Sequence, residues 1–231
     1  MPLVEHLAEL RQRIIVSVVA VALGGVVAFL LYNRILDFLI GPYTDITGKK
    51  TLVITDPLEG FTTRLKIAGF GGLALASPVV LWELWRFITP GLHKREKRYA
   101  IPFILASILL FLLGVAVAML TFPQALRFLI AVGGNDLETF FTPTKYLNLV
   151  VLMMAAFGIA FEFPIVLIFL QLARVLSSRR LRSWRRPAVV VIVAVAAVIT
   201  PSQDPYSLLA MAVPMYMFYE GSILVGRLMK R

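Results

Sequence analysis

The sequence predicts an all-α, polytopic membrane protein with six transmembrane helices, and three observations support this fold class. Hydrophobic residues make up 59% of the chain and charged residues only 16%, with a mean hydropathy of +0.86. A soluble domain is roughly 45–50% apolar and about 25% charged. The apolar residues gather into long runs, and a run of about 20 residues spans a bilayer core as a helix. The charged residues lie mainly between these runs.

We expect a single integral-membrane domain covering residues 1–231. The amino-terminal segment 1–13 is expected to form a cytoplasmic amphipathic helix, because Leu3, Leu7 and Leu10 repeat on one helical face. Segments 33–65 and 123–145 are expected to be outer loops, since both are rich in proline and glycine. The approximate spans are 14–32, 66–85, 99–122, 146–172, 187–200 and 206–226.

The last two spans are predicted to be short. Residues 187–200 would form a helix of about 21 Å, less than the bilayer core of about 30 Å. The final run is interrupted by Pro214 and reaches Glu220 after about three turns. These segments could cross a locally thinned bilayer or form a re-entrant hairpin. Both alternatives return the chain to the side that it left.

Small residues recur at four-residue spacing in the second span, at Ala68, Gly72 and Ala76. In lipid, this spacing allows two helix backbones to approach closely. We therefore expect another helix to pack tightly against this stripe.

The distribution of basic residues predicts the orientation. Sixteen of the 23 Lys and Arg residues fall in the termini and the 86–98 and 173–186 loops, which share one side. The opposite side carries seven basic and seven acidic residues and is close to neutral. The positive-inside rule therefore places both termini in the cytoplasm.

Several function classes are excluded by composition. The chain has no cysteine and only two histidines, His6 and His93, so neither a thiolate site nor a histidine metal centre is expected. The positive net charge comes without a nucleic-acid recognition motif, so we expect no nucleic-acid partner. No HExxH motif, Ser-His pair or buried Asp pair is present. We therefore expect neither an enzyme nor a cofactor.

Two acidic residues stand out near apolar segments. Glu162 follows thirteen uncharged residues and precedes Pro164, and an ionised carboxylate at such depth costs about 2.5–3.5 kcal/mol. It is either a neutral acid bonded to a neighbouring helix or a functional polar site. Asp204 lies in TPSQDP, where ordinary turn chemistry is the simpler interpretation. An alternative hypothesis is an ion-coupled secondary transporter that uses both acids, although we find no internal repeat of the kind this class has.

Glu9 and Glu96 lie in basic segments on the predicted inner side. Glu9 can pair with Arg13 four residues on, and Glu96 sits among lysines and arginines, so local charge balance is one interpretation. The other is that the two carboxylates meet on the inner surface and capture a cationic ligand. A guanidinium in forked geometry would suit them best.

Five segments together resemble the TatC family, the core subunit of the twin-arginine protein translocase. The segments are HLAELRQR at 6–13, SPVVLWELWRFITPGLHKREKR at 77–98, FGIAFEFP at 157–164, TPSQDP at 200–205 and PMYMFYE at 214–220. The resemblance implies six helices arranged like a cupped hand in the bacterial inner membrane. It also implies a receptor for folded proteins with Arg-Arg signal peptides, working with single-span TatA/TatB-type subunits in a multimeric complex.

The resemblance also assigns roles to individual residues. Glu9 and Glu96 correspond to the acidic pair that engages the two arginines, and Glu162, followed by Pro164, to an intramembrane site of partner contact. The other positions matching the family's signal-peptide-binding motifs are Arg11, Arg13, Phe87, Pro90, Leu92 and Arg98. Near Asp204 the chain departs from the family's pattern, because Leu208 stands where the family often has glutamine.

Overall fold

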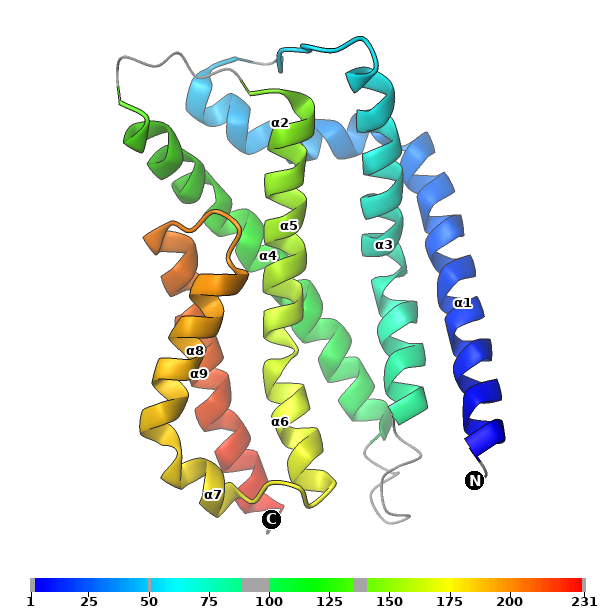
Figure 1. Cartoon of the computed structure of the whole chain (residues 1–231), viewed down its shortest axis with the longest axis vertical. Helices are drawn as coiled ribbons and strands as arrows, with labels where there is room; N and C mark the ends of the chain where they lie inside the picture. The colour runs from blue at the N-terminus through cyan, green and yellow to red at the C-terminus, as the bar shows by residue number, and fades with distance from the viewer. Residues whose placement is uncertain (1–2, 50, 89–99, 135–140, 230–231) are drawn as a thin grey trace. The chain divides into compact units, whose positions relative to one another are not determined.

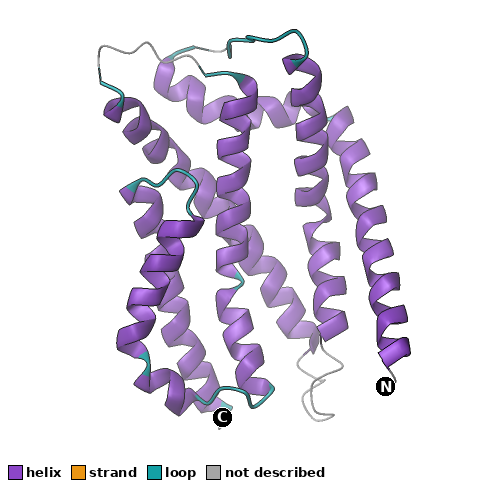
Figure 2. Ribbon diagram, viewed as in Figure 1, coloured by secondary structure: helices purple, strands orange, loops and turns teal. Residues whose placement is uncertain are grey.

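The computed structural model describes residues 3–49, 51–88, 100–134 and 141–229, and regular structure in these ranges is helical (Figure 2). The helices are α1 (Leu3–Leu30), α2 (Tyr32–Thr47), α3 (Glu59–Ile88), α4 (Ala100–Val132), α5 (Pro143–Phe161), α6 (Phe163–Leu172), α7 (Ser178–Ser183), α8 (Arg185–Ile199) and α9 (Pro205–Leu228). They form two compact units. Unit 1 comprises residues 1–108 and 140–147, and unit 2 comprises 109–139 and 148–231.

Five helical segments in the described ranges are long and apolar enough to cross a membrane. They are His6–Leu30, Glu59–Ile88, Ile101–Val132, Pro143–Leu172 and Pro205–Leu228. This confirms the predicted all-α, polytopic class. Helix α8 has 15 residues and is about 22 Å long, which is less than the thickness of the bilayer core.

In unit 1, α1 and α3 lie side by side in opposite directions (Figure 1). Glycines permit this close approach: a Cβ on Gly72 would lie 2.6 Å from the Gly25 nitrogen, and one on Gly24 would lie 2.7 Å from the Gly72 carbonyl oxygen. The predicted tight packing at the small-residue stripe is therefore confirmed. The contact fixes which residues of α1 face which residues of α3.

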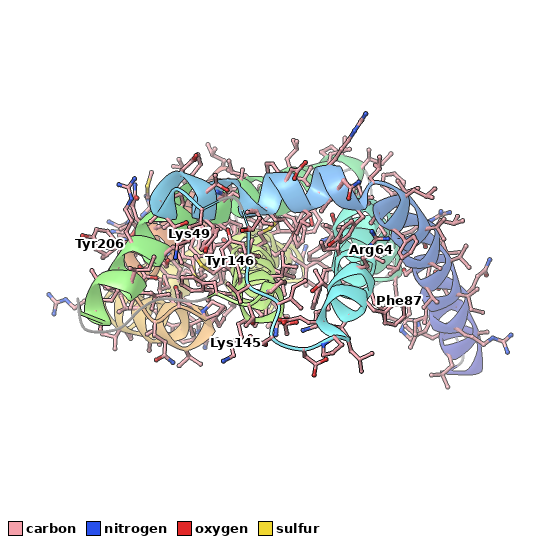
Figure 3. The ribbon with its side chains drawn as sticks, turned by 90° about the horizontal axis from the view of Figure 1, so that it is seen from above. Lys49, Arg64, Phe87, Lys145, Tyr146 and Tyr206 are labelled. Atoms are coloured by element: carbon pink, nitrogen blue, oxygen red, sulfur yellow. The ribbon has the colours of Figure 1, made fainter. Side chains whose placement is uncertain are left out.

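The end of unit 1 away from the amino terminus is held together by buried polar contacts. The Tyr146 hydroxyl, which lies beside α2 (Figure 3), donates to the Leu39 carbonyl at 2.7 Å. The buried Glu59 carboxylate accepts from the backbone N–H groups of Thr55, at 3.0 Å, and Thr144, at 3.2 Å. These bonds tie the loop before α3 to the start of α5.

In unit 2, α9 packs against α6, α7 and α8. Buried Gln171 on α6 donates from Nε2 to the Ser222 carbonyl at 3.0 Å, and Tyr219 donates to the Leu181 carbonyl at 2.6 Å. Gly226 leaves the space that the Gln171 side chain fills. The carboxyl-terminal part of α9 is thus fixed to both α6 and α7.

Several helices differ from the predicted boundaries. The amino-terminal segment and the first span form one continuous helix, and α2 occupies part of the expected outer loop 33–65. Helix α4 continues through Pro123, beyond the predicted span 99–122, and the last helix continues without a break through Pro214, which was predicted to interrupt it. Proline does not end these helices, because neighbouring helices and local adjustments can satisfy the freed backbone groups of a membrane helix.

Candidate functional site

A cluster of three charged side chains joins α1 to α3 in unit 1. Arg13 donates from Nη1 to Glu83 Oε2 at 2.7 Å and from Nη2 to Glu9 Oε1 at 3.1 Å. Side-chain exposure is 19% for Arg13, 23% for Glu9 and 11% for Glu83. We refer to these residues as the charge cluster. One guanidinium therefore links carboxylates from two different helices.

Helix geometry and the antiparallel packing of α1 and α3 bring the cluster together. Glu9 and Arg13 are four residues apart and share a face of α1. Glu83 and Phe87 have the same spacing on α3, near its carboxyl-terminal end. The Phe87 ring, labelled in Figure 3, stacks on His6, with ring centroids 4.4 Å apart and an interplanar angle of 16°. This stacked pair is a second contact between α1 and α3, on the amino-terminal side of the charge cluster along α1.

The charge cluster has the chemistry of a guanidinium site. Carboxylates bind guanidinium groups with short, charge-assisted and often bidentate hydrogen bonds. Glu9 and Glu83 each use one oxygen for Arg13, and within the described ranges the other oxygen of each carboxylate forms no hydrogen bond. The cluster carries a formal charge of −1 with both acids ionised. It can therefore attract a second cation.

Sequence reasoning missed Glu83. It falls near the end of the predicted second span, between Trp82 and Trp85, and an acid inside a predicted span is itself a sign of function. That signal was available in the sequence. The pairing with Arg13 was not, because it joins residues 70 positions apart and depends on how α1 packs against α3.

The structure places only part of the predicted receptor set. Glu9, Arg13 and Phe87 lie together at the α1–α3 contact, whereas Arg11 is exposed on α1. The remaining predicted residues lie outside the described residues: Glu96, Pro90, Leu92 and Arg98.

Glu162 lies in unit 2 at an interruption between α5 and α6. Its N–H donates to the Ile159 carbonyl and its carbonyl accepts from the Val166 N–H, both at 3.1 Å. Pro164, buried in the first turn of α6, has no N–H to continue the ladder of α5, which accounts for the interruption. The Glu162 side chain is partly exposed. Part of Glu162 is therefore exposed within an apolar segment, whereas its Oε1 atom is buried.

Asp204 forms the amino-terminal cap of α9. Its buried carboxylate accepts from the Ser207 N–H at 2.8 Å and from the Ser202 hydroxyl. This is local helix-capping chemistry, in line with the simpler interpretation of the TPSQDP segment.

Among the described residues, no group of three His, Cys, Asp or Glu side chains is arranged to hold a metal ion. In the charge cluster, the cation between the two carboxylates is the guanidinium of Arg13, so these acids form ion pairs within the chain.

Comparison with known proteins identifies the family. A family model described as Sec-independent protein translocase protein (TatC) matches residues 5–214. The chain belongs to the TatC family. The match covers α1 through the first part of α9, and therefore includes the charge cluster, Glu162 and Asp204.

Curated TatC proteins align with the whole chain. The TatC protein of Frankia casuarinae is 41% identical over 243 residues, covering 100% of this chain and 67% of the relative. That of Aquifex aeolicus is 39% identical over 234 residues, covering 100% of this chain and 97% of the relative. These matches favour a translocase component over the ion-coupled transporter hypothesis.

A solved TatC structure shares the fold. A crystal structure described as the twin-arginine translocase receptor TatC in DDM superposes with a TM-score of 0.79 at 38% identity, covering 96% of this chain and 99% of that chain. A second crystal structure of the twin-arginine translocase receptor TatC gives a TM-score of 0.78. As a TatC protein, the chain is accordingly a core component of the Tat translocase.

Proposed function

We propose that this chain is the receptor subunit of a twin-arginine translocase and binds Arg-Arg signal peptides of folded proteins at its cytoplasmic face. The observation that carries the proposal is the guanidinium of Arg13 held between Glu9 and Glu83. Carboxylates arranged in this way suit the arginines of such a peptide. The description of the solved relatives as twin-arginine translocase receptors supports the same ligand.

The proposed peptide site combines the charge cluster with the adjoining loop. Glu9 and Glu96 bind the two arginines, and the aromatic ring of Phe87 packs beside them. The other contributors proposed by motif position are Arg11, Arg13, Pro90, Leu92 and Arg98. The chain acts by binding and assembly, without catalysing a reaction.

We place the protein in the bacterial cytoplasmic membrane with both termini inside. The excess of Lys and Arg in the termini and in the 86–98 and 173–186 segments supports this orientation. In this orientation, the charge cluster near the amino terminus faces the cytoplasm, where a precursor protein carrying the signal peptide can reach it before transport.

We further propose that Glu162 and Pro164 contact single-span TatA/TatB-type subunits within a multimeric complex. A partly exposed acid in an apolar segment suits a polar side chain of another membrane helix. The helix interruption at Glu162 adds backbone polarity at the same level.

Peptide binding to Glu9→Gln, Glu96→Gln and the double variant tests the receptor function. Each substitution removes a charge while keeping the side-chain shape. We expect each single variant to lower affinity for an Arg-Arg peptide by about tenfold, and the double variant by more, since a hydrogen-bonded charge pair contributes about 1.5–3 kcal/mol. Unchanged affinity in all three, with normal membrane insertion, would reject the proposed site.

Association with single-span subunits tests the role of Glu162. We expect Glu162→Ala to weaken co-purification of a TatA/TatB-type subunit more than it weakens peptide binding. Ile159→Ala is the matched control, because Ile159 is 64% exposed and lies within one turn of Glu162. A loss of peptide binding with intact subunit association would remove Glu162 from the partner role.

A further inference from the structure

Arg13 has the same chemical group as the proposed ligand. Its guanidinium occupies one oxygen of Glu9 and one oxygen of Glu83, with 81% of its own side chain shielded from solvent. The site that is proposed to receive a guanidinium from outside therefore already holds one from within the chain.

An incoming arginine competes with this internal guanidinium. A forked contact uses both oxygens of one carboxylate in parallel hydrogen bonds. Arg13 engages one oxygen of each acid, so a second guanidinium on either carboxylate would lie directly beside it with like charge. The net charge of −1 still attracts the incoming guanidinium, but repulsion from Arg13 weakens its binding, and the attraction is stronger once Arg13 moves aside.

We propose that Arg13 is an internal occupant that the signal-peptide arginine displaces, and that Glu83 is a further peptide-binding carboxylate. This inference rests on the proposed receptor function and refines it: Arg13, assigned to the peptide site by motif position, occupies the site in the resting protein and does not itself contact the bound peptide. In the resting protein Arg13 shields two carboxylates from non-specific cations. On binding, the peptide guanidinium takes its place between α1 and α3.

The geometry makes the exchange feasible. The Glu9 pair is between residues four apart on one helix, and both partners are partly exposed, so solvent screens their attraction. The Arg13 side chain is long, and Arg11 and Gln12 just before it are exposed, so the guanidinium can move outward toward the amino-terminal end of α1. Glu83, the least exposed of the three, remains as the acceptor that distinguishes a planar guanidinium from the compact charge of lysine.

The occupant reduces the fraction of protein that is ready to bind. Apparent affinity equals intrinsic affinity multiplied by the fraction in the competent state. Removal of the occupant therefore tightens binding, whereas loss of a positioning residue would weaken it. The direction of the change separates the two roles.

The test measures affinity of the full chain in detergent or nanodiscs for an Arg-Arg peptide and a Lys-Lys peptide. The variants are Arg13→Gln, Glu83→Gln and the double variant. Arg86→Gln is the charge control, because it removes an exposed positive charge three residues after Glu83 on the same helix. Arg13→Lys keeps the positive charge and shows whether the planar guanidinium of Arg13 is needed for it to occupy the site.

We expect Arg13→Gln to bind the Arg-Arg peptide about threefold to tenfold more tightly, in keeping with release of partly exposed ion pairs. The gain should exceed that of Arg86→Gln. Glu83→Gln should bind about tenfold more weakly than the unmodified chain, because a charged acceptor is lost. The double variant should lose the gain seen with Arg13→Gln, and Arg13→Lys should fall between the unmodified chain and Arg13→Gln.

Weaker binding by Arg13→Gln, or a gain no larger than that of Arg86→Gln, would overturn the internal-occupant role. Unchanged binding by Glu83→Gln would overturn the role of Glu83. Misfolding cannot produce tighter binding, so the main result is protected from that explanation. If Glu83→Gln does not accumulate, Glu83→Asp should weaken binding, because it keeps the charge but shortens the side chain by one methylene and moves the carboxylate away from the ligand. If the unmodified chain does not prefer the Arg-Arg peptide, the receptor function itself fails.

Discussion

Asp204 illustrates how one buried acid can be explained by local structure. It is fully buried, and its carboxylate accepts from the N–H of Ser207, in the first turn of α9, and from Ser202. The first turn of a helix has N–H groups without intrahelical partners, and a side-chain acceptor at the cap satisfies one of them. The role of Asp204 is therefore to fix where α9 begins.

Replacement of Asp204 by alanine should lower stability by about 0.5–2 kcal/mol, because the cap and its hydrogen bonds are lost. Asp204→Asn should lower stability by less than Asp204→Ala, since asparagine is an equally good capping residue. Thermal unfolding of the purified protein in one detergent measures both. Equal destabilisation by the two variants would show that the negative charge, rather than the cap, is what matters.

At the scale of elements, α1 and α3 form the contact on which the proposed receptor site depends. Backbone atoms of Gly24 and Gly25 lie against Gly72, and neither Gly24 nor Gly72 has space for a side chain. This contact sets the register that places Arg13 against Glu83 and His6 against Phe87. The glycines lie away from the charge cluster, yet they determine its geometry.

Gly72→Ala should force α1 and α3 apart, because the added Cβ would meet backbone atoms of Gly25 and Val21 at 2.6–2.8 Å. Overpacking of this kind costs about 1–3 kcal/mol. We expect a lower unfolding temperature together with weaker Arg-Arg peptide binding. Gly69→Ala is the matched control, since a Cβ there meets nothing within 4 Å and alanine favours helix. Equal effects of both variants would show that the close approach is not essential.

The sequence predicts those elements that the bilayer itself requires. Long apolar runs identify the spans because an unpaired backbone cannot lie in lipid, and the pairing of Glu9 with Arg13 follows from helix periodicity. The link from Arg13 to Glu83 and that from Gln171 to Ser222 depend on the packing of helices that are distant in sequence. The predicted end of a helix before Pro123 is wrong, and Pro214 does not interrupt the last helix, because tertiary surroundings override the local effect of proline.

At the scale of the whole molecule, the proposed topology can be tested by thiol labelling, because the chain contains no cysteine of its own. The test uses two variants with one cysteine each, at exposed positions: Lys49→Cys in the predicted outer segment and Ser183→Cys in the predicted inner one. A membrane-impermeant thiol reagent should label Lys49→Cys in intact cells and Ser183→Cys only after permeabilisation. The opposite pattern would reverse the orientation and remove the charge cluster from the cytoplasmic face.

The most direct measurement of the central claim is photocrosslinking of an Arg-Arg precursor to the charge cluster in membranes. A photoreactive residue at position 86 shares a face of α3 with Glu83. The account predicts a crosslink to the Arg-Arg precursor that is strongly reduced with a Lys-Lys precursor and with Glu9→Gln. A crosslink of equal strength with both precursors, unaffected by Glu9→Gln, would contradict recognition of arginine at this site.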